Sequence, residues 1–88
     1  MNIEFHLEYK KAYKKRISSQ PKLVSKSKER IELFRNNPQN PLLKDHALTG
    51  TRRGHRSFSI TGDIRVIYEQ VDDETVRFLD IGSHNQVY

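Results

Sequence analysis

The spacing of the hydrophobic residues changes twice along this 88-residue chain, and this change limits the possible folds most. Ile3, Phe5 and Leu7 alternate with polar residues, which is the period-two pattern of a half-buried strand. Between residues 9 and 34 the apolar residues recur every three or four positions, as on amphipathic helices. After residue 54 the pattern again favours strands. The order strand, helix, helix and then about three strands predicts an α+β domain of two layers.

The helical part of the pattern predicts a hairpin of two helices. The apolar face of the first helix is formed by Tyr9, Ala12, Tyr13 and Ile17. Residues 18–20 interrupt this face, and Pro21 then stands at a position suited to the first turn of a second helix. The second helix is expected to end near residues 36–38, and its apolar stripe consists of Leu23, Val24, Ser27, Ile31 and Phe34.

The segment that follows the helices has no regular period. Residues 37–41 read NPQNP, and the two prolines exclude a regular hydrogen-bonded ladder, so we predict a loop. Residues 42–50 have apolar anchors around a polar centre. They predict an ordered loop that packs onto the domain.

The last part of the chain predicts three consecutive strands. The first begins near Gly54 and has Phe58 and Ile60 on one face. A tight turn is expected at residues 61–62, with Gly62 at a positive φ. The strands 64–71 and 76–81 are joined by a turn at residues 72–73, and both are apolar on both faces, so they should lie centrally. The expected sheet has about four strands, is mostly antiparallel and packs against the helical hairpin.

Length and composition indicate one domain, residues 1–88, with a thin core. The hydrophobic fraction is 34% and the mean hydropathy is −0.84, which suits a protein that covers part of its surface with a partner. The chain has no cysteine, so disulfides and thiolate metal sites are excluded. Because no signal peptide or membrane span is visible, we expect a cytoplasmic protein that does not contact membranes.

The charge of the chain is strongly basic. Sixteen Lys and Arg residues against eleven Asp and Glu residues give a net charge of +5 and a pI near 9.7. Nucleic acid is the leading partner for such a surface. A basic surface that serves solubility alone explains the composition equally well.

Three motifs in order carry a resemblance to a known family: LKDHALTG, RGHRSFSITGDIRVIYE and IGSHNQVY. Together they resemble the RelE/ParE superfamily of bacterial toxins, and most closely its YafQ-like branch of mRNA interferases. The resemblance covers nearly the whole chain. It implies a small sheet backed by a helical hairpin, cleavage of mRNA in the ribosomal A site without a metal or other cofactor, and silencing by a cognate antitoxin.

The resemblance also implies which residues act. The expected catalytic residues are His46, Asp63, His84 and Tyr88. The expected contacts to RNA or phosphate are Arg65, which matches an arginine of the family's central strand, together with Arg56, Lys44 and His55. The chain departs from the YafQ pattern at three positions, because Ser59 stands for a histidine, Ile64 for a tryptophan and His55 for a tyrosine.

These residue types suit RNA cleavage by the 2′-hydroxyl. A base must remove the hydroxyl proton, a cation must stabilise the phosphorane, and an acid must protonate the leaving 5′ oxygen. Histidine serves both proton roles near neutral pH, and arginine binds two phosphate oxygens at once. We therefore expect His46 and His84 to share the proton transfers, Asp63 to orient one of them, and Tyr88 to stack on a base or bond near the phosphate.

Two other functions remain open from the sequence. A ParE-like toxin would share the fold and act on DNA gyrase, and it would not need paired histidines. A non-catalytic basic module, either an RNA-binding domain or a degenerate toxin, is compatible with the changes at Ser59 and Ile64.

Overall fold

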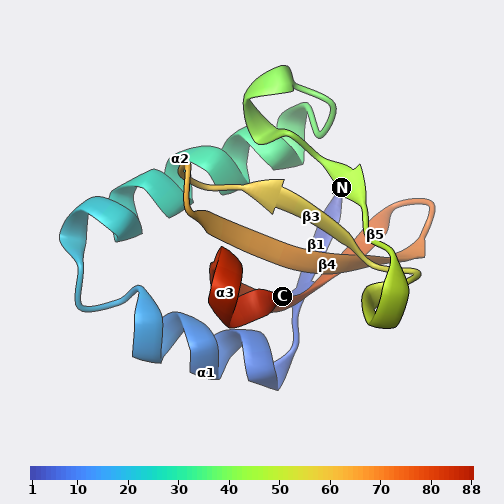
Figure 1. Cartoon of the computed structure of the whole chain (residues 1–88). Helices are drawn as coiled ribbons and strands as arrows, with labels where there is room; N and C mark the ends of the chain where they lie inside the picture. Colours follow the sequence, from blue (N-terminus) through green and yellow to red (C-terminus); the bar gives the residue numbers. More distant parts are fainter.

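Strand β1 (Asn2–Phe5) begins the computed structural model, which describes residues 1–88 (Figure 1). The helices α1 (Leu7–Arg16) and α2 (Pro21–Asn36) follow, and Pro21 occupies the first turn of α2 as expected. A 3₁₀ turn (Pro41–Leu43), strand β2 (His46–Ala47) and a second 3₁₀ turn (Gly50–Arg52) lead into the meander. The remaining elements are β3 (Arg56–Ser59), β4 (Ile64–Asp72), β5 (Thr75–Ser83) and the one-turn helix α3 (His84–Val87).

The strands form one five-stranded sheet in the order β1-β5-β4-β3-β2. Strand β1 runs parallel to β5, and the other three pairs are antiparallel. The predicted meander and the central position of β4 and β5 are confirmed. The sheet has one strand more than expected, because β2 pairs with the edge of β3.

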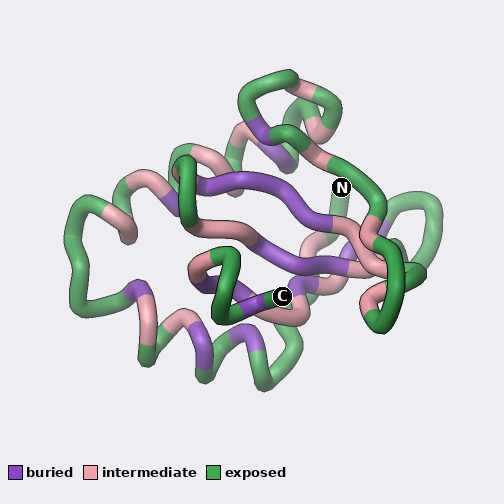
Figure 2. The backbone as a smooth tube through the Cα atoms, in the orientation of Figure 1, coloured by how far each residue is buried: buried purple, intermediate pink, exposed green.

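The helical hairpin covers one face of the sheet with an aromatic core. Phe34 of α2 stacks on Phe58 of β3, with ring centroids 4.3 Å apart, and contacts the rings of Tyr68 and Phe78 edge-on. All three phenylalanines are fully buried. The predicted apolar stripes of both helices pack into or against this core, and Figure 2 shows buried positions recurring along the helices. The core therefore depends on the helix period that the sequence displays.

The opposite face of the sheet is covered by α3. On β4, Ile67 stands between the core residues Val66 and Tyr68. It is fully buried but does not belong to the main core cluster. Because neighbouring strand residues point to opposite faces, Ile67 lies on the second face. Val87 of α3 is also buried, and α3 packs on β4 and β5 there (Figure 1). This second face carries most of the residues considered below.

Two local predictions need correction. The segment 42–50, expected as an ordered loop, contains β2 and overlaps the 3₁₀ turns Pro41–Leu43 and Gly50–Arg52. Gly62 has no positive φ; the residues that do are Lys44, Gly50 and Gly54. The turn before β4 is instead closed by Thr61, whose hydroxyl accepts hydrogen bonds from the backbone N–H groups of Asp63 and Ile64.

The first strand also differs from its prediction. Leu7 begins α1 and is 60% exposed, so it does not continue the buried face of β1. The ring of Phe5 is partly exposed and packs on Tyr9 and Phe78 at the edge of the core. No helix of the structure is both long and apolar enough to span a bilayer.

Replacing Phe34 should test the aromatic core. Phe34→Ala removes a fully buried ring and leaves a cavity, so we expect the free energy of unfolding to fall by about 3–5 kcal/mol. Urea unfolding followed by circular dichroism measures this loss. Leu42→Ala is the matched control, because Leu42 is 60% exposed and its truncation should change stability by less than about 0.5 kcal/mol. Equal losses for the two variants would contradict this description of the core.

Candidate functional site

Asp45 fixes the short strand β2 to the sheet. Its carboxylate is nearly buried, with 10% of the side chain exposed. Oδ1 accepts a hydrogen bond from Arg56 Nε at 2.8 Å and forms an ion pair with Nη2 at 2.7 Å, and Oδ2 accepts a hydrogen bond from the Tyr68 hydroxyl. The hydrogen bond that Arg56 donates to Asp45 raises the pKa of Arg56. The pKa of Tyr68 is raised first by burial and then by its own hydrogen bond to Asp45. The segment that carries His46 is therefore tied to both β3 and β4.

His46 is placed on the second face of the sheet by its register. It pairs with Ser57 of β3, and paired residues on neighbouring strands project to the same face. Its Nδ1 lies 2.9 Å from the carbonyl oxygen of Lys44. Because a carbonyl only accepts hydrogen bonds, Nδ1 carries the proton and the neutral ring keeps its lone pair on Nε2. Lys44 presents that carbonyl from a left-handed conformation with φ 50°.

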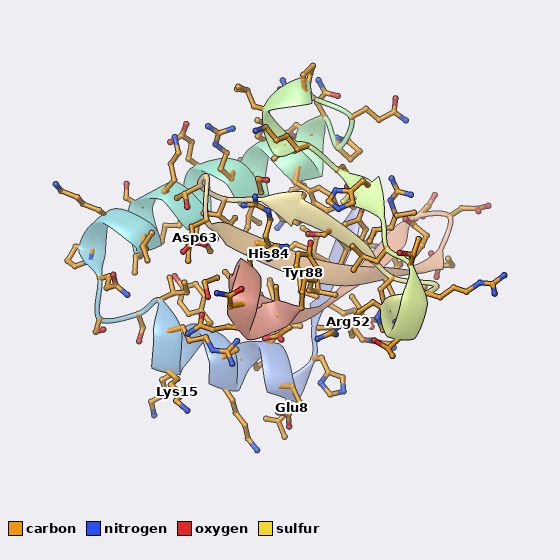
Figure 3. The ribbon with its side chains drawn as sticks, in the orientation of Figure 1. Glu8, Lys15, Arg52, Asp63, His84 and Tyr88 are labelled. Atoms are coloured by element: carbon orange, nitrogen blue, oxygen red, sulfur yellow. The ribbon has the colours of Figure 1, made fainter.

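Tyr88 and His84 reach the same face from α3. The Tyr88 hydroxyl lies 2.6 Å from Ser57 Oγ. Ser57 is the residue that pairs with His46 across the two strands. The ring of His84 packs edge-on against the ring of Tyr88, with centroids 4.5 Å apart. Both side chains are labelled next to each other on α3 in Figure 3. Ser57 thus brings together a strand residue and a helix residue that are far apart in the sequence.

His46 and Tyr88 line one shallow hollow of about 290 Å³. Its other lining residues are Leu48, Thr49, Thr51 and Arg52. Arg52 donates a hydrogen bond from Nη2 to the carbonyl oxygen of Val87 at 2.7 Å and so holds the end of α3. The hollow combines an imidazole, a phenol and a guanidinium, which are groups that transfer protons or bind phosphate.

Asp63 does not line this hollow. It is exposed in the turn between β3 and β4, and it borders a second hollow together with Lys15, Arg16 and Gln86. In Figure 3 it lies on the side of His84 away from Tyr88. Asp63 lies in the turn before β4, whereas the hollow is lined by residues of the segment 46–52 and by Tyr88, and this explains why Asp63 is separated from His46. Of the four residues expected in one concavity, His46 and Tyr88 line it, His84 contacts Tyr88 without lining it, and Asp63 borders the second hollow.

Arg65 shares the face of the hollow without lining it. It lies two residues before Ile67 on β4, and its Nη1 donates to the carbonyl oxygen of Thr61 at 2.9 Å. Ser59, which pairs with Arg65, is buried, and Ile64 packs against the core. Two of the three departures from the family pattern therefore lie beside Arg65, Ser59 at the end of β3 and Ile64 at the start of β4.

Three other predicted contacts to RNA lie elsewhere. Arg56 is paired with Asp45 in a hollow of about 670 Å³ that Lys44 also lines, on the side of Tyr68. His55 Nε2 is 3.8 Å from a carboxylate oxygen of Glu69, which itself binds Arg77. Arg56 and His55 therefore form ion pairs away from the hollow of His46 and Tyr88, and their contacts to RNA stay predictions. The exposed Lys44 stays a predicted RNA contact.

Sequence reasoning missed Arg52 and Ser57. Ser57 looks like an ordinary buried strand residue, and nothing in the sequence marks its contact with Tyr88. Arg52 was detectable in principle, because it stands in a basic loop, TRRGHR, directly after the LKDHALTG motif. No group of three or more His, Asp or Glu side chains is arranged to hold a metal ion.

The chain matches one family over its full length. The family model described as "Bacterial toxin of type II toxin-antitoxin system, YafQ" covers residues 1–88. YafQ from E. coli strain BL21(DE3) is 27% identical, with a TM-score of 0.83 over 99% of this chain and 97% of that chain. The E. coli DinJ–YafQ toxin–antitoxin complex gives 28% identity and a TM-score of 0.76 over 99% and 96% of the two chains.

A more distant structure shares the fold. The YoeB/ParE toxin from Agrobacterium tumefaciens is 21% identical, with a TM-score of 0.77 over 96% of this chain and 99% of that chain. A comparison with curated protein sequences gives no match. The family model and the E. coli structures confirm the resemblance seen in the sequence motifs. The chain belongs to the YafQ family of bacterial toxins of type II toxin–antitoxin systems.

Proposed function

We propose that this toxin is an endoribonuclease that cuts mRNA in the ribosomal A site and so inhibits translation. The observation that carries the proposal is the hollow lined by His46 and Tyr88, with the His84 ring packed against Tyr88. Two imidazoles beside a phenol and a cation supply the groups that 2′-hydroxyl attack requires. A ParE-like action on gyrase does not account for this grouping.

His46 is the proposed general base. Its Nδ1–H is engaged by the Lys44 carbonyl, so the lone pair of Nε2 is free to accept the 2′-hydroxyl proton. The 2′ oxygen then attacks the phosphorus, and the bond to the 5′ oxygen breaks. The products are a 2′,3′-cyclic phosphate and a 5′-hydroxyl end.

His84 is the proposed general acid, because it is the second exposed imidazole of the group and contacts Tyr88 rather than His46. Protonated His84 would give its proton to the leaving 5′ oxygen. Arg65 is proposed to help stabilise the phosphorane, since it lies on the same sheet face. Asp63, which borders the second hollow in the turn before β4, is proposed to orient one of the two histidines.

The shape of the hollow supports dependence on the ribosome. About 290 Å³ and six lining residues offer an RNA few contacts, so the toxin alone would hold its substrate loosely. A ribosome presents mRNA in a fixed conformation and supplies the positioning that the hollow lacks. The basic side chains of α1 give the toxin a positive surface for docking on ribosomal RNA.

We also propose a cognate antitoxin as the cellular partner. The related E. coli toxin YafQ forms a toxin–antitoxin complex with DinJ. In this chain Phe5 and Leu7, two positions apart in the sequence, are exposed apolar residues that a partner could cover. Their burial is compatible with a partner that wraps the toxin.

Cleavage on the ribosome tests the proposed reaction. Wild-type toxin added to translating ribosomes should generate mRNA 5′-hydroxyl ends within the A-site codon, mapped by primer extension. His46→Ala and His84→Ala should each lower the cleavage rate by about 10²–10⁴-fold, because each removes one positioned proton transfer. His6→Ala is the control, since His6 caps the start of α1 and should cut at the wild-type rate.

A substrate with sulfur in place of the 5′ bridging oxygen separates the two histidines. The thiolate leaves without protonation, so this mRNA should restore cutting by His84→Ala but not by His46→Ala. Restoration of both variants or of neither would refute the assignment of base and acid. Absence of cleavage by the wild type on ribosomes would reject the nuclease itself.

The role of Tyr88 can be divided between its ring and its hydroxyl. Tyr88→Phe keeps the ring against His84 and loses the bond to Ser57, which is worth about 1 kcal/mol, so the cleavage rate should fall about fivefold. Ser57→Ala should cause the same loss, and the double variant should lose no more than either. Deleting Tyr88 should cost more, because the ring goes too. Undiminished cutting by the truncated chain would remove Tyr88 from the site.

Expression in growing cells tests the antitoxin proposal. The toxin alone should arrest growth, and the gene encoded beside it should relieve the arrest when it is co-expressed. The His84→Ala variant should permit growth yet still bind the neighbouring protein in co-purification. If that protein leaves growth arrest unchanged and does not bind, the partner proposal is wrong.

A further inference from the structure

Arg52 lies between two hollows of the surface. On one side it lines the hollow of His46 and Tyr88, where it is the only lysine or arginine. On the other side it borders a hollow of about 520 Å³ that Lys11, Lys15 and Arg16 also line. Figure 3 shows Arg52 beyond Tyr88, in a row that continues from His84. It is therefore the cation that lines the hollow of the proposed base.

The side chain of Arg52 is held at one end and free at the other. Nη2 donates to the carbonyl oxygen of Val87 and lies 3.9 Å from a carboxylate oxygen of Asp80. Asp80 is itself bound by Arg16, with Nη1 and Oδ1 3.2 Å apart. The remaining N–H groups of Arg52 form no hydrogen bond within the protein, and 34% of the side chain is exposed. These contacts fix the guanidinium in place and leave donors for a ligand.

We propose that Arg52 binds a non-bridging oxygen of the scissile phosphate while its bond to Val87 fixes α3. The proposal rests on the nuclease function proposed above and adds a residue to that site. A guanidinium beside the hollow has the planar fork that matches phosphate oxygens. Since its charge is partly shielded from water and already oriented, it stabilises the developing phosphorane at little cost of reorganisation.

Neighbouring arginines do not provide the same contact. Arg65 is bound to the Thr61 carbonyl and does not line the hollow. Arg53, the next residue in the loop, is exposed and makes no side-chain hydrogen bond or ion pair. Arg53 therefore serves as a control for a general loss of positive charge in this loop.

Three variants of the full-length toxin separate charge from anchoring. Arg52→Gln removes the charge and keeps an N–H donor for the Val87 carbonyl, while Arg52→Lys keeps the charge and loses the fork. Single-turnover cleavage at saturating ribosomes should fall about 100-fold in Arg52→Gln and about tenfold in Arg52→Lys. Arg53→Gln should stay within about twofold of the wild type, because loss of an exposed charge affects mainly binding. Thermal unfolding checks that each variant is folded.

Each outcome decides the proposal. Cleavage by Arg52→Gln at the rate of Arg53→Gln would overturn it, provided that the wild type cuts and His84→Ala does not. An equal loss in Arg52→Lys and Arg52→Gln would also overturn it, because the charge would then be irrelevant and only the position of α3 would matter. If Arg52→Gln unfolds, the Arg52→Lys rate alone decides, with a loss of less than twofold counting against phosphate binding. Failure of the wild type to cut would instead reject the nuclease function.

Discussion

The hydrogen bonds of the Asp45 carboxylate hold the rest of the site in place. A strand of two residues has too few ladder hydrogen bonds to be stable by itself, and β2 lies at the edge of the sheet. Asp45 compensates by binding Arg56 and Tyr68 on two neighbouring strands. Hydrogen bonds to a charged group contribute about 1.5–3 kcal/mol each, which is enough to order a segment of this size. His46 follows Asp45 directly, so its position depends on this anchor.

The one-turn helix α3 is likewise held by contacts from outside itself. A four-residue helix does not form alone, because nucleation costs more than one turn returns. Ser83 and Gln86 cap its start through reciprocal hydrogen bonds, and Arg52 binds its last carbonyl. Gly82 allows the close packing, since a Cβ there would meet Gln86 Oε1 at 2.7 Å and Arg16 Nη1 at 2.8 Å. A side chain at this position would displace the ends of the Gln86 and Arg16 side chains and so disturb the cap of α3.

The sequence predicted the elements that bury a periodic face and failed where a few specific contacts decide the structure. The hairpin, the meander and the stacked Phe34 and Phe58 follow from repeated apolar spacing over many residues. The strand β2 and the helix α3 have no period long enough to detect, and both form because tertiary hydrogen bonds select them.

The same reason explains the outcome for the site. The motifs pointed to His46, His84 and Tyr88 as candidates, because residue type and order are readable in a sequence. The Ser57 contact, the Arg52 anchor and the position of Asp63 outside the hollow are properties of three-dimensional distance. Arg56 is the clearest example, because a sequence does not show whether an arginine is free or is paired with a carboxylate, as Arg56 is with Asp45.

The two faces of the sheet are stabilised by different forces, and this division suits a toxin. Packed aromatic rings hold the hairpin face, whereas the site face has Ile67 and Val87 as its buried apolar side chains and relies on directed hydrogen bonds. Regions with few apolar contacts open at a lower free-energy cost than the core. The segment with His84 and Tyr88 is therefore expected to open at a lower free-energy cost than the hairpin. Because the aromatic core contains no residue of α3, the fold does not depend on the segment that carries these two side chains.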